Sequence, residues 1–116
     1  MPTETEFIAA ADATLAKIGL ALDAALETGN ADVDWNLNDG ILEIECDDGS
    51  KLIINRHVPN RELWVAARAG GFHFRADGGI WRDTRSGDDL AAVLAKLLRA
   101  QAGLTMTLPT LPAPSA

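Results

Sequence analysis

Residues 62–74 read ELWVAARAGGFHF, and this stretch decides the fold class. Leu63 and Val65 alternate with Glu62, Trp64 and Ala66. This period of two indicates a β-strand with one apolar face. The pair Gly70-Gly71 indicates a hairpin turn into a second strand. Since Leu63 and Val65 are expected to pack on a core, Trp64 is expected to lie on the opposite face of the sheet, toward solvent.

The same alternation extends to both sides of this stretch. NDG at 38–40, DDGS at 47–50 and GG at 78–79 are typical of turns between strands. Such short connections join antiparallel neighbours, and an antiparallel sheet can leave one face in water. Five or six strands are therefore predicted, at residues 32–37, 41–46, 51–55, 62–67, 71–75 and 79–82.

A helix is predicted before the strands, over residues 4–28. Thr3 and Glu6 have the spacing of a capping box, which satisfies free amide groups at a helix start. Gly29 is predicted to end the helix in a left-handed conformation. Its apolar stripe has helical spacing and comprises Phe7, Ala11, Leu15, Ile18, Leu22 and Leu26.

A second helix is predicted after the last strand. Ser86 is the predicted N-cap, with Asp89 three residues on, and Gly103 ends the helix. The order of elements predicts an α+β protein, a two-layer αβ-sandwich with two helices packed on one face of a five- to six-stranded antiparallel sheet. A single domain over residues 1–103 is predicted, followed by an irregular, proline-rich tail at 104–116.

The charge is distributed unevenly along the chain. The net charge is −7, but residues 1–49 hold twelve acidic side chains and one basic one, whereas residues 50–116 hold five and nine. An acidic surface argues against nucleic acid as a partner, since phosphates require a basic footprint. No run is long and apolar enough for a membrane span, and the lone Cys46 fits a reducing compartment. A cytoplasmic protein is expected.

Acidic residues gather on one predicted edge. On a helical wheel Asp12, Asp23 and Glu27 fall within about 60° of one another. Asp32 and Asp34 follow on the outward face of the first strand, and Glu43 and Glu45 extend the group. Carboxylate oxygens suit hard cations such as iron, manganese, calcium or magnesium. Spacing alone favours a solvated charged face, while the repulsion between crowded acids favours a functional role.

Trp64 is the second candidate feature. A solvent-facing tryptophan flanked by arginine is typical of a binding anchor. Its candidate neighbours are Asn55, Arg56, His57, Arg61 and Arg68. His57 and His73 have no partner at metal-ligand spacing, and no nucleophile–base pair or phosphate-binding loop is present. Chemistry catalysed by this chain alone is therefore not expected.

Three segments together carry a family resemblance. NRHVPNRELWVAARAGGFHF at 55–74, DGSKLIIN at 48–55 and WRDTRSG at 81–87 are similar to motifs of the frataxin family in its bacterial, CyaY-type form. The resemblance spans the chain from Glu6 to Gly103. It implies the αβ-sandwich already predicted and a role in iron–sulfur cluster assembly as a regulator that is not an enzyme.

The resemblance also assigns roles to residues. By position Asp23, Glu27, Asp32 and Asp34 take the place of an acidic ridge that binds Fe²⁺ and Fe³⁺ weakly. Frataxins contact the cysteine desulfurase–scaffold complex through this ridge and the exposed sheet. The predicted partner-binding residues are Trp64, Asn55, His57, Arg61, Arg68, Asp23 and Glu27.

The chain departs from the family pattern at two informative positions. Ile8 stands where bacterial members often carry a histidine, and His57 where many carry glutamine, so fewer or weaker iron sites are expected. Two alternatives stay open beside the regulator: an iron chaperone that delivers Fe²⁺ to the scaffold, and a ferroxidase or iron-storage protein. A monomer is expected.

Overall fold

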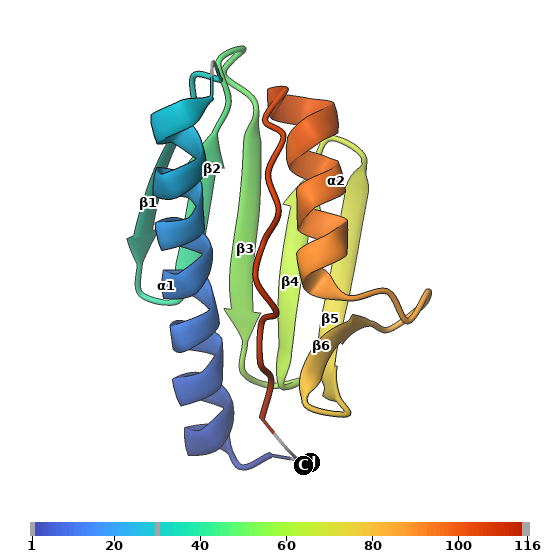
Figure 1. Ribbon diagram of the computed structural model, residues 1–116. Helices are drawn as coiled ribbons and strands as arrows, with labels where there is room; N and C mark the ends of the chain where they lie inside the picture. Colours follow the sequence, from blue (N-terminus) through green and yellow to red (C-terminus); the bar gives the residue numbers. More distant parts are fainter. Residues whose placement is uncertain (1, 30, 115–116) are drawn as a thin grey trace.

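The computed structural model describes residues 2–29 and 31–114. Helix α1 precedes six strands and helix α2 follows them (Figure 1). The elements are α1 (Glu4–Thr28), β1 (Asp34–Asn38), β2 (Ile41–Glu45), β3 (Lys51–His57), β4 (Glu62–Ala67), β5 (Gly70–Asp77), β6 (Ile80–Asp83) and α2 (Leu90–Ala102). No helix within the described residues is long and apolar enough to cross a membrane.

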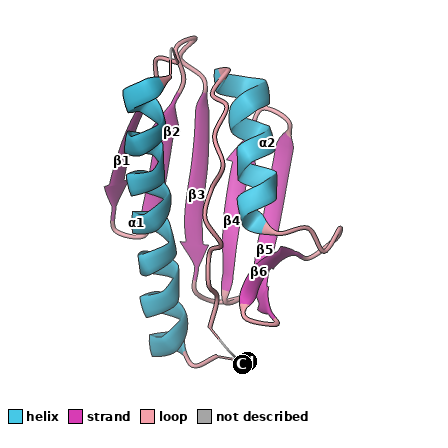
Figure 2. Cartoon of the chain, viewed as in Figure 1, coloured by secondary structure: helices cyan, strands magenta, loops and turns pink. Residues whose placement is uncertain are grey.

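The six strands form one antiparallel sheet in the order β1-β2-β3-β4-β5-β6. Both helices and the C-terminal tail lie on the same face of this sheet (Figures 1 and 2). The predicted two-layer αβ-sandwich is therefore confirmed, with six strands. The opposite face, called the outer face below, carries no helix from the described part of the chain.

Helix α1 begins as the sequence indicates. Thr3 and Glu6 form a reciprocal capping box, and the stripe from Phe7 to Leu22 is buried against the sheet. The predicted left-handed cap at Gly29 is wrong, since its φ of −95° and ψ of 170° are extended. The Gly29 amide still donates to the carbonyl of Ala25, so the last turn closes without a left-handed residue.

Helix α2 begins later than the Ser86 cap predicts. Asp89 is the N-cap, and its carboxylate accepts from the amide of Ala91. Ser86 belongs to the preceding loop, where the carboxylate of Asp83 accepts from the backbone amides of residues 85 and 86. These bonds hold the chain in a loop up to residue 88. Gly103 does end the helix in a left-handed conformation, with φ of 66°.

Two strand boundaries differ from the prediction. The β4–β5 turn consists of Arg68 and Ala69, because Ala67 pairs with Gly70 and both glycines belong to β5. The first strand starts at Asp34, so Asp32 lies outside it. Turns at 38–40, 47–50 and 78–79 are where the sequence predicts them.

The tail from residue 104 runs between the two helices (Figure 1). Leu104, Leu108 and Leu111 are buried in the shared core. The carbonyl of Pro112 accepts from the hydroxyl of Thr14, at 3.4 Å between the oxygens. The division into a domain over 1–103 and a tail over 104–116 stays a prediction, which truncated chains can test.

The tail also contacts the outermost strand. Ile80 of β6 forms an isolated β-bridge with Pro112, and the amide of Ala113 donates to the carbonyl of Gly79. A second bridge joins Arg82 to Asp89. These contacts use backbone groups on the edge of β6 that faces away from β5.

Candidate functional site

Three aromatic rings stack across the outer face. Trp64 of β4 lies between His57 of β3 and His73 of β5. The indole and the His57 imidazole are 3.7 Å apart between centroids and 8° from parallel. The indole and the His73 imidazole are 4.3 Å apart and 5° from parallel. Both faces of the indole are therefore covered, and Trp64 lies on the outer face of the sheet, as the alternation predicts, but is partly buried.

A carboxylate lies beside this stack. Glu62 is only 3% exposed, although it stands on the outer face two residues before Trp64. Its carboxylate accepts from Trp64 Nε1 at 2.9 Å and from Arg75 Nη2 at 2.6 Å, and His73 Nδ1 lies 3.7 Å away. Burial raises the pKa of Glu62, but the hydrogen bonds from Trp64 and Arg75 outweigh it. The pKa therefore lies below the usual value.

Replacing Glu62 should make the fold less sensitive to acid. Because the folded-state pKa is lowered, the charged carboxylate stabilises the fold above the unfolded pKa near 4.5. That contribution is lost as the pH falls through the folded-state pKa. The stability difference between the native chain and Glu62→Gln, measured by urea unfolding, should thus be larger near about pH 7 than near about pH 3. An equal difference at both values would contradict this assignment.

The other predicted partner residues on β3, β4 and their turns do not all gather at the stack. Asn55 stands directly opposite Trp64 on β3 and belongs with the stack. Arg61 lies in the β3–β4 turn, where its guanidinium donates to the carbonyl of Val58. Arg68 lies at the other end of β4 and pairs with Asp48. The two arginines therefore do not flank Trp64 as one cluster.

Arg56 is not a neighbour of Trp64 on the outer face. It pairs in register with Leu63, a buried residue, and so points to the helix side of the sheet. There its guanidinium forms ion pairs with Asp12 of α1 and with Asp39 in the β1–β2 turn. The prediction is wrong because successive strand residues alternate faces, so Asn55 and His57 cannot share theirs with Arg56.

The acids on α1 do not form one group either. Asp12 and Asp23 share a wheel angle, but eleven residues separate them along the helix, about 16 Å. Asp12 is neutralised by Arg56, whereas Asp23 accepts from Trp35 Nε1 at 2.8 Å. Trp35 packs on Gly19, where an added Cβ would lie 2.6 Å from the indole. Asp23 is therefore tied to β1 through a fixed ring.

The acidic surface consists of Asp23, Glu27, Asp32 and Asp34, all exposed. They belong to the last two turns of α1, the start of β1 and the segment between these elements, and α1 contacts β1 at one edge of the sheet (Figure 1). Among the described residues, no three side chains of the types His, Cys, Asp or Glu lie close enough to hold a metal ion together. The surface is thus open, and its role in binding iron stays a prediction.

Comparison with known proteins identifies the family of this chain. The frataxin-like domain model matches residues 1–104. The chain belongs to the frataxin family. Its relatives are of the bacterial, CyaY type. The iron-sulfur cluster assembly protein CyaY of Cupriavidus metallidurans is 48% identical over 106 residues, which cover 91% of this chain and 96% of that protein. The protein so named in Dechloromonas aromatica is 52% identical, covering 90% and 97%.

Solved frataxins share the architecture. Frataxin from Psychromonas ingrahamii superimposes with a TM-score of 0.82 at 33% identity, covering 91% of this chain and 97% of that one. Trimeric frataxin from Saccharomyces cerevisiae, complexed with ferrous iron, gives a TM-score of 0.72 at 24% identity, covering 81% and 86%. The second likeness is one of fold alone.

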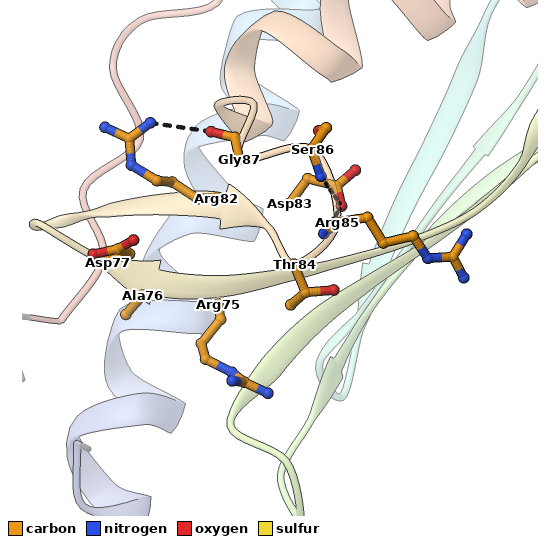
Figure 3. Close-up of a pocket in the computed structure, with 9 residues that line it drawn as sticks. All are labelled: Arg75, Ala76, Asp77, Arg82, Asp83, Thr84, Arg85, Ser86 and Gly87. Carbon is orange, nitrogen blue, oxygen red and sulfur yellow. Dashed lines mark hydrogen bonds between the residues drawn. The ribbon is translucent and has the colours of Figure 1, made fainter.

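This frataxin also has a shallow cleft of about 490 Å³ at the β5–β6 end of the sheet (Figure 3). Arg75, Arg82 and Arg85 line it, but their side chains point in different directions. Arg82 donates to the carbonyl of Gly87, and Asp83 is used by loop amides. Since the guanidinium groups do not converge, the cleft is not arranged to enclose one anion.

Sequence reasoning missed Glu62, His73 and Arg75 as members of the site. A signal was available for two of them, since Glu62 stands two positions from Trp64 and Arg75 two positions from His73. Residues at that spacing share a face. What the sequence lacks is the register, which puts Trp64 opposite His73 and Glu62 opposite Arg75.

Proposed function

We propose that this frataxin acts in iron–sulfur cluster assembly as a non-enzymatic regulator that binds a cysteine desulfurase and its scaffold partner. Support comes from relatives that carry the name iron-sulfur cluster assembly protein and align over nearly all of the chain. The predicted cytoplasmic location and monomeric state remain predictions.

The observation that carries this proposal is the stack around Trp64 on the outer face. A partly exposed tryptophan held by its neighbours loses little conformational freedom when a partner covers it. Tryptophan is also the residue type most enriched among side chains that dominate binding energy. These two properties make the outer face suitable for contact with a partner protein.

The acidic surface provides the second part of the proposed contact. Asp23, Glu27, Asp32 and Asp34 make no ion pair among the described residues. Their charges are therefore available to a basic patch on the desulfurase. Such contacts steer association, and they weaken as salt screens them.

Replacing Trp64 or reversing the acids should weaken desulfurase binding. We expect Trp64→Ala to cost about 1–4 kcal/mol of binding free energy, because it removes the central ring of the outer face. Asp23→Lys/Glu27→Lys should also weaken binding, and it should reduce the salt dependence of the affinity. Titration calorimetry at two salt concentrations measures both effects, with circular dichroism to confirm the fold.

The matched control reverses two acids at the opposite edge. Asp77→Lys/Asp88→Lys changes the net charge by the same amount, but these two residues lie at the end of β5 and in the loop between β6 and α2. Equal loss of binding in the control would mean that net charge alone acts. Unchanged binding in both the Trp64 variant and the Asp23/Glu27 variant would sink the proposed function.

An iron chaperone is the second candidate, because the unpaired acids are also available to a hard cation. Glu27, Asp32 and Asp34 are exposed and spread along the edge, which favours weak binding with water completing the shell. A ferroxidase is less well supported, since it requires converging ligands.

Anaerobic titration with Fe²⁺ should show weak, saturable binding that Asp32→Asn/Asp34→Asn reduces. The reason is that neutral amides attract a hard cation less than carboxylates do. Calorimetry measures the affinity, and Asp77→Asn/Asp88→Asn is the control for lost charge elsewhere. If the native chain shows no saturation at millimolar Fe²⁺, the chaperone function is rejected.

A further inference from the structure

Glu62 is an unusual residue for the outer face of this sheet. Its side chain is 4% exposed, whereas Arg75, its ion-pair partner, is 59% exposed. A carboxylate is costly to bury unless hydrogen bonds replace its water. Here three groups face it: the Trp64 indole nitrogen, the Arg75 guanidinium and Nδ1 of His73. The carboxylate is thus held in place by the residues that surround it.

The contact with Glu62 uses the only hydrogen-bond donor of the Trp64 side chain. The two imidazoles cover the two faces of the same ring. The buried Nδ1 of His57 has no hydrogen-bond partner among the described residues, and stacking on the indole is the contact that the structure gives this ring. What remains of Trp64 for a partner is therefore a carbon edge of the indole, with no donor and no free π face.

We propose that Glu62 is the positioning residue of this surface, and that the partner meets the carbon edge of Trp64 with an apolar group rather than with a hydrogen-bond acceptor or a cation. Glu62 fixes the indole nitrogen at the sheet, which holds the ring between His57 and His73. The proposal rests on the proposed function for its partner, but the orientation of Trp64 is a property of the free chain.

Three variants separate the roles of Glu62. Glu62→Gln keeps one carbonyl oxygen that can accept from Trp64, but it removes the charge and the second acceptor oxygen, which Arg75 uses. Glu62→Ala removes the acceptor as well. Asp77→Asn removes an exposed carboxylate from the same strand as Arg75 without touching the stack. These variants are compared in the free chain and with the desulfurase.

Nuclear magnetic resonance of the indole groups is the first measurement. We expect Glu62→Ala to shift the Trp64 indole N–H signal and to abolish the cross-relaxation between Trp64 and the two histidine rings. Glu62→Gln should retain the ring contacts, and Asp77→Asn should change neither. If the Trp64 indole signal and the ring contacts are unchanged in Glu62→Ala, the positioning role is overturned, whatever the effect on desulfurase binding.

Calorimetry with the desulfurase is the second measurement. Glu62→Ala should weaken binding about 2- to 12-fold, since a loosened ring must be ordered on binding, and Glu62→Gln should restore most of that loss. Trp64→Phe, which keeps an apolar ring and lacks the donor, should bind far better than Trp64→Ala. Equal loss in Trp64→Phe and Trp64→Ala would overturn the apolar contact. If Glu62→Ala loses the ring contacts but the native chain does not bind the desulfurase, the proposed function is rejected and the positioning role of Glu62 is retained.

Discussion

A chain that ends at Gly103 should be less stable than the native chain by about 2–5 kcal/mol or more. Truncation removes Leu104, Leu108 and Leu111, which are 2%, 7% and 0% exposed. Each buried leucine contributes about 1.5–3 kcal/mol, and the entropy of ordering the tail offsets part of the sum. Truncation also removes the segment that runs between the two helices (Figure 1), and so exposes core residues against which the three leucines pack.

Urea unfolding followed by circular dichroism measures this effect. A chain that ends at Ala113 retains all three leucines and is the control for shortening. Leu111→Ala in the full chain should account for much of the loss, because that side chain is fully buried. Equal stability of the chains ending at Gly103 and Ala113 would show that the tail adds nothing, and would support a domain complete at residue 103.

Trp81→Ala should lower the free energy of unfolding by about 3–5 kcal/mol. The ring is fully buried and meets Phe7 edge-to-face, with centroids 6.0 Å apart. Its Nε1 donates to the hydroxyl of Thr14 at 3.0 Å, and Thr14 in turn donates to Pro112. The substitution therefore leaves a cavity at the point where α1, β6 and the tail meet.

Trp81→Phe separates packing from hydrogen bonding. Both substitutions leave the Thr14 hydroxyl without the indole donor. Because Trp81→Phe keeps an aromatic ring against Phe7, it should lower the free energy of unfolding less than Trp81→Ala does. Unfolding in urea compares the two variants. If Trp81→Ala costs under about 1 kcal/mol, the core at this point is able to rearrange, and the packing described for Trp81 does not determine stability.

The sequence predicts well those features that depend on near neighbours in the chain. The capping box of Thr3 and Glu6, the α1 stripe and the turns at 38–40, 47–50 and 78–79 follow from short-range patterns, and the structure contains them. The N-cap of α2 does not follow so directly, because Ser86 and Asp89 are both good caps. Asp83, fixed on β6, decides between them by holding the loop.

The candidate site is harder to predict, because it depends on register and on side-chain reach. Alternation places Trp64 on the outer face, but only the pairing of β4 with β5 brings His73 and Arg75 to it. Alternation likewise excludes Arg56, which reaches Asp12 across the layers. The open arrangement of the acids depends on where α1 lies over the sheet.

The two bridges on β6 limit how copies of this sheet can associate. An exposed edge strand is a template for strand addition, and residues 112 and 89 already occupy positions on the β6 edge. Within the described part of the chain, β1 pairs only with β2 and keeps one edge open. Joining two copies through β1 makes a two-fold symmetric pair whose exposed edges are both the blocked β6. If copies associate by strand addition at β1, the addition should therefore stop at two copies.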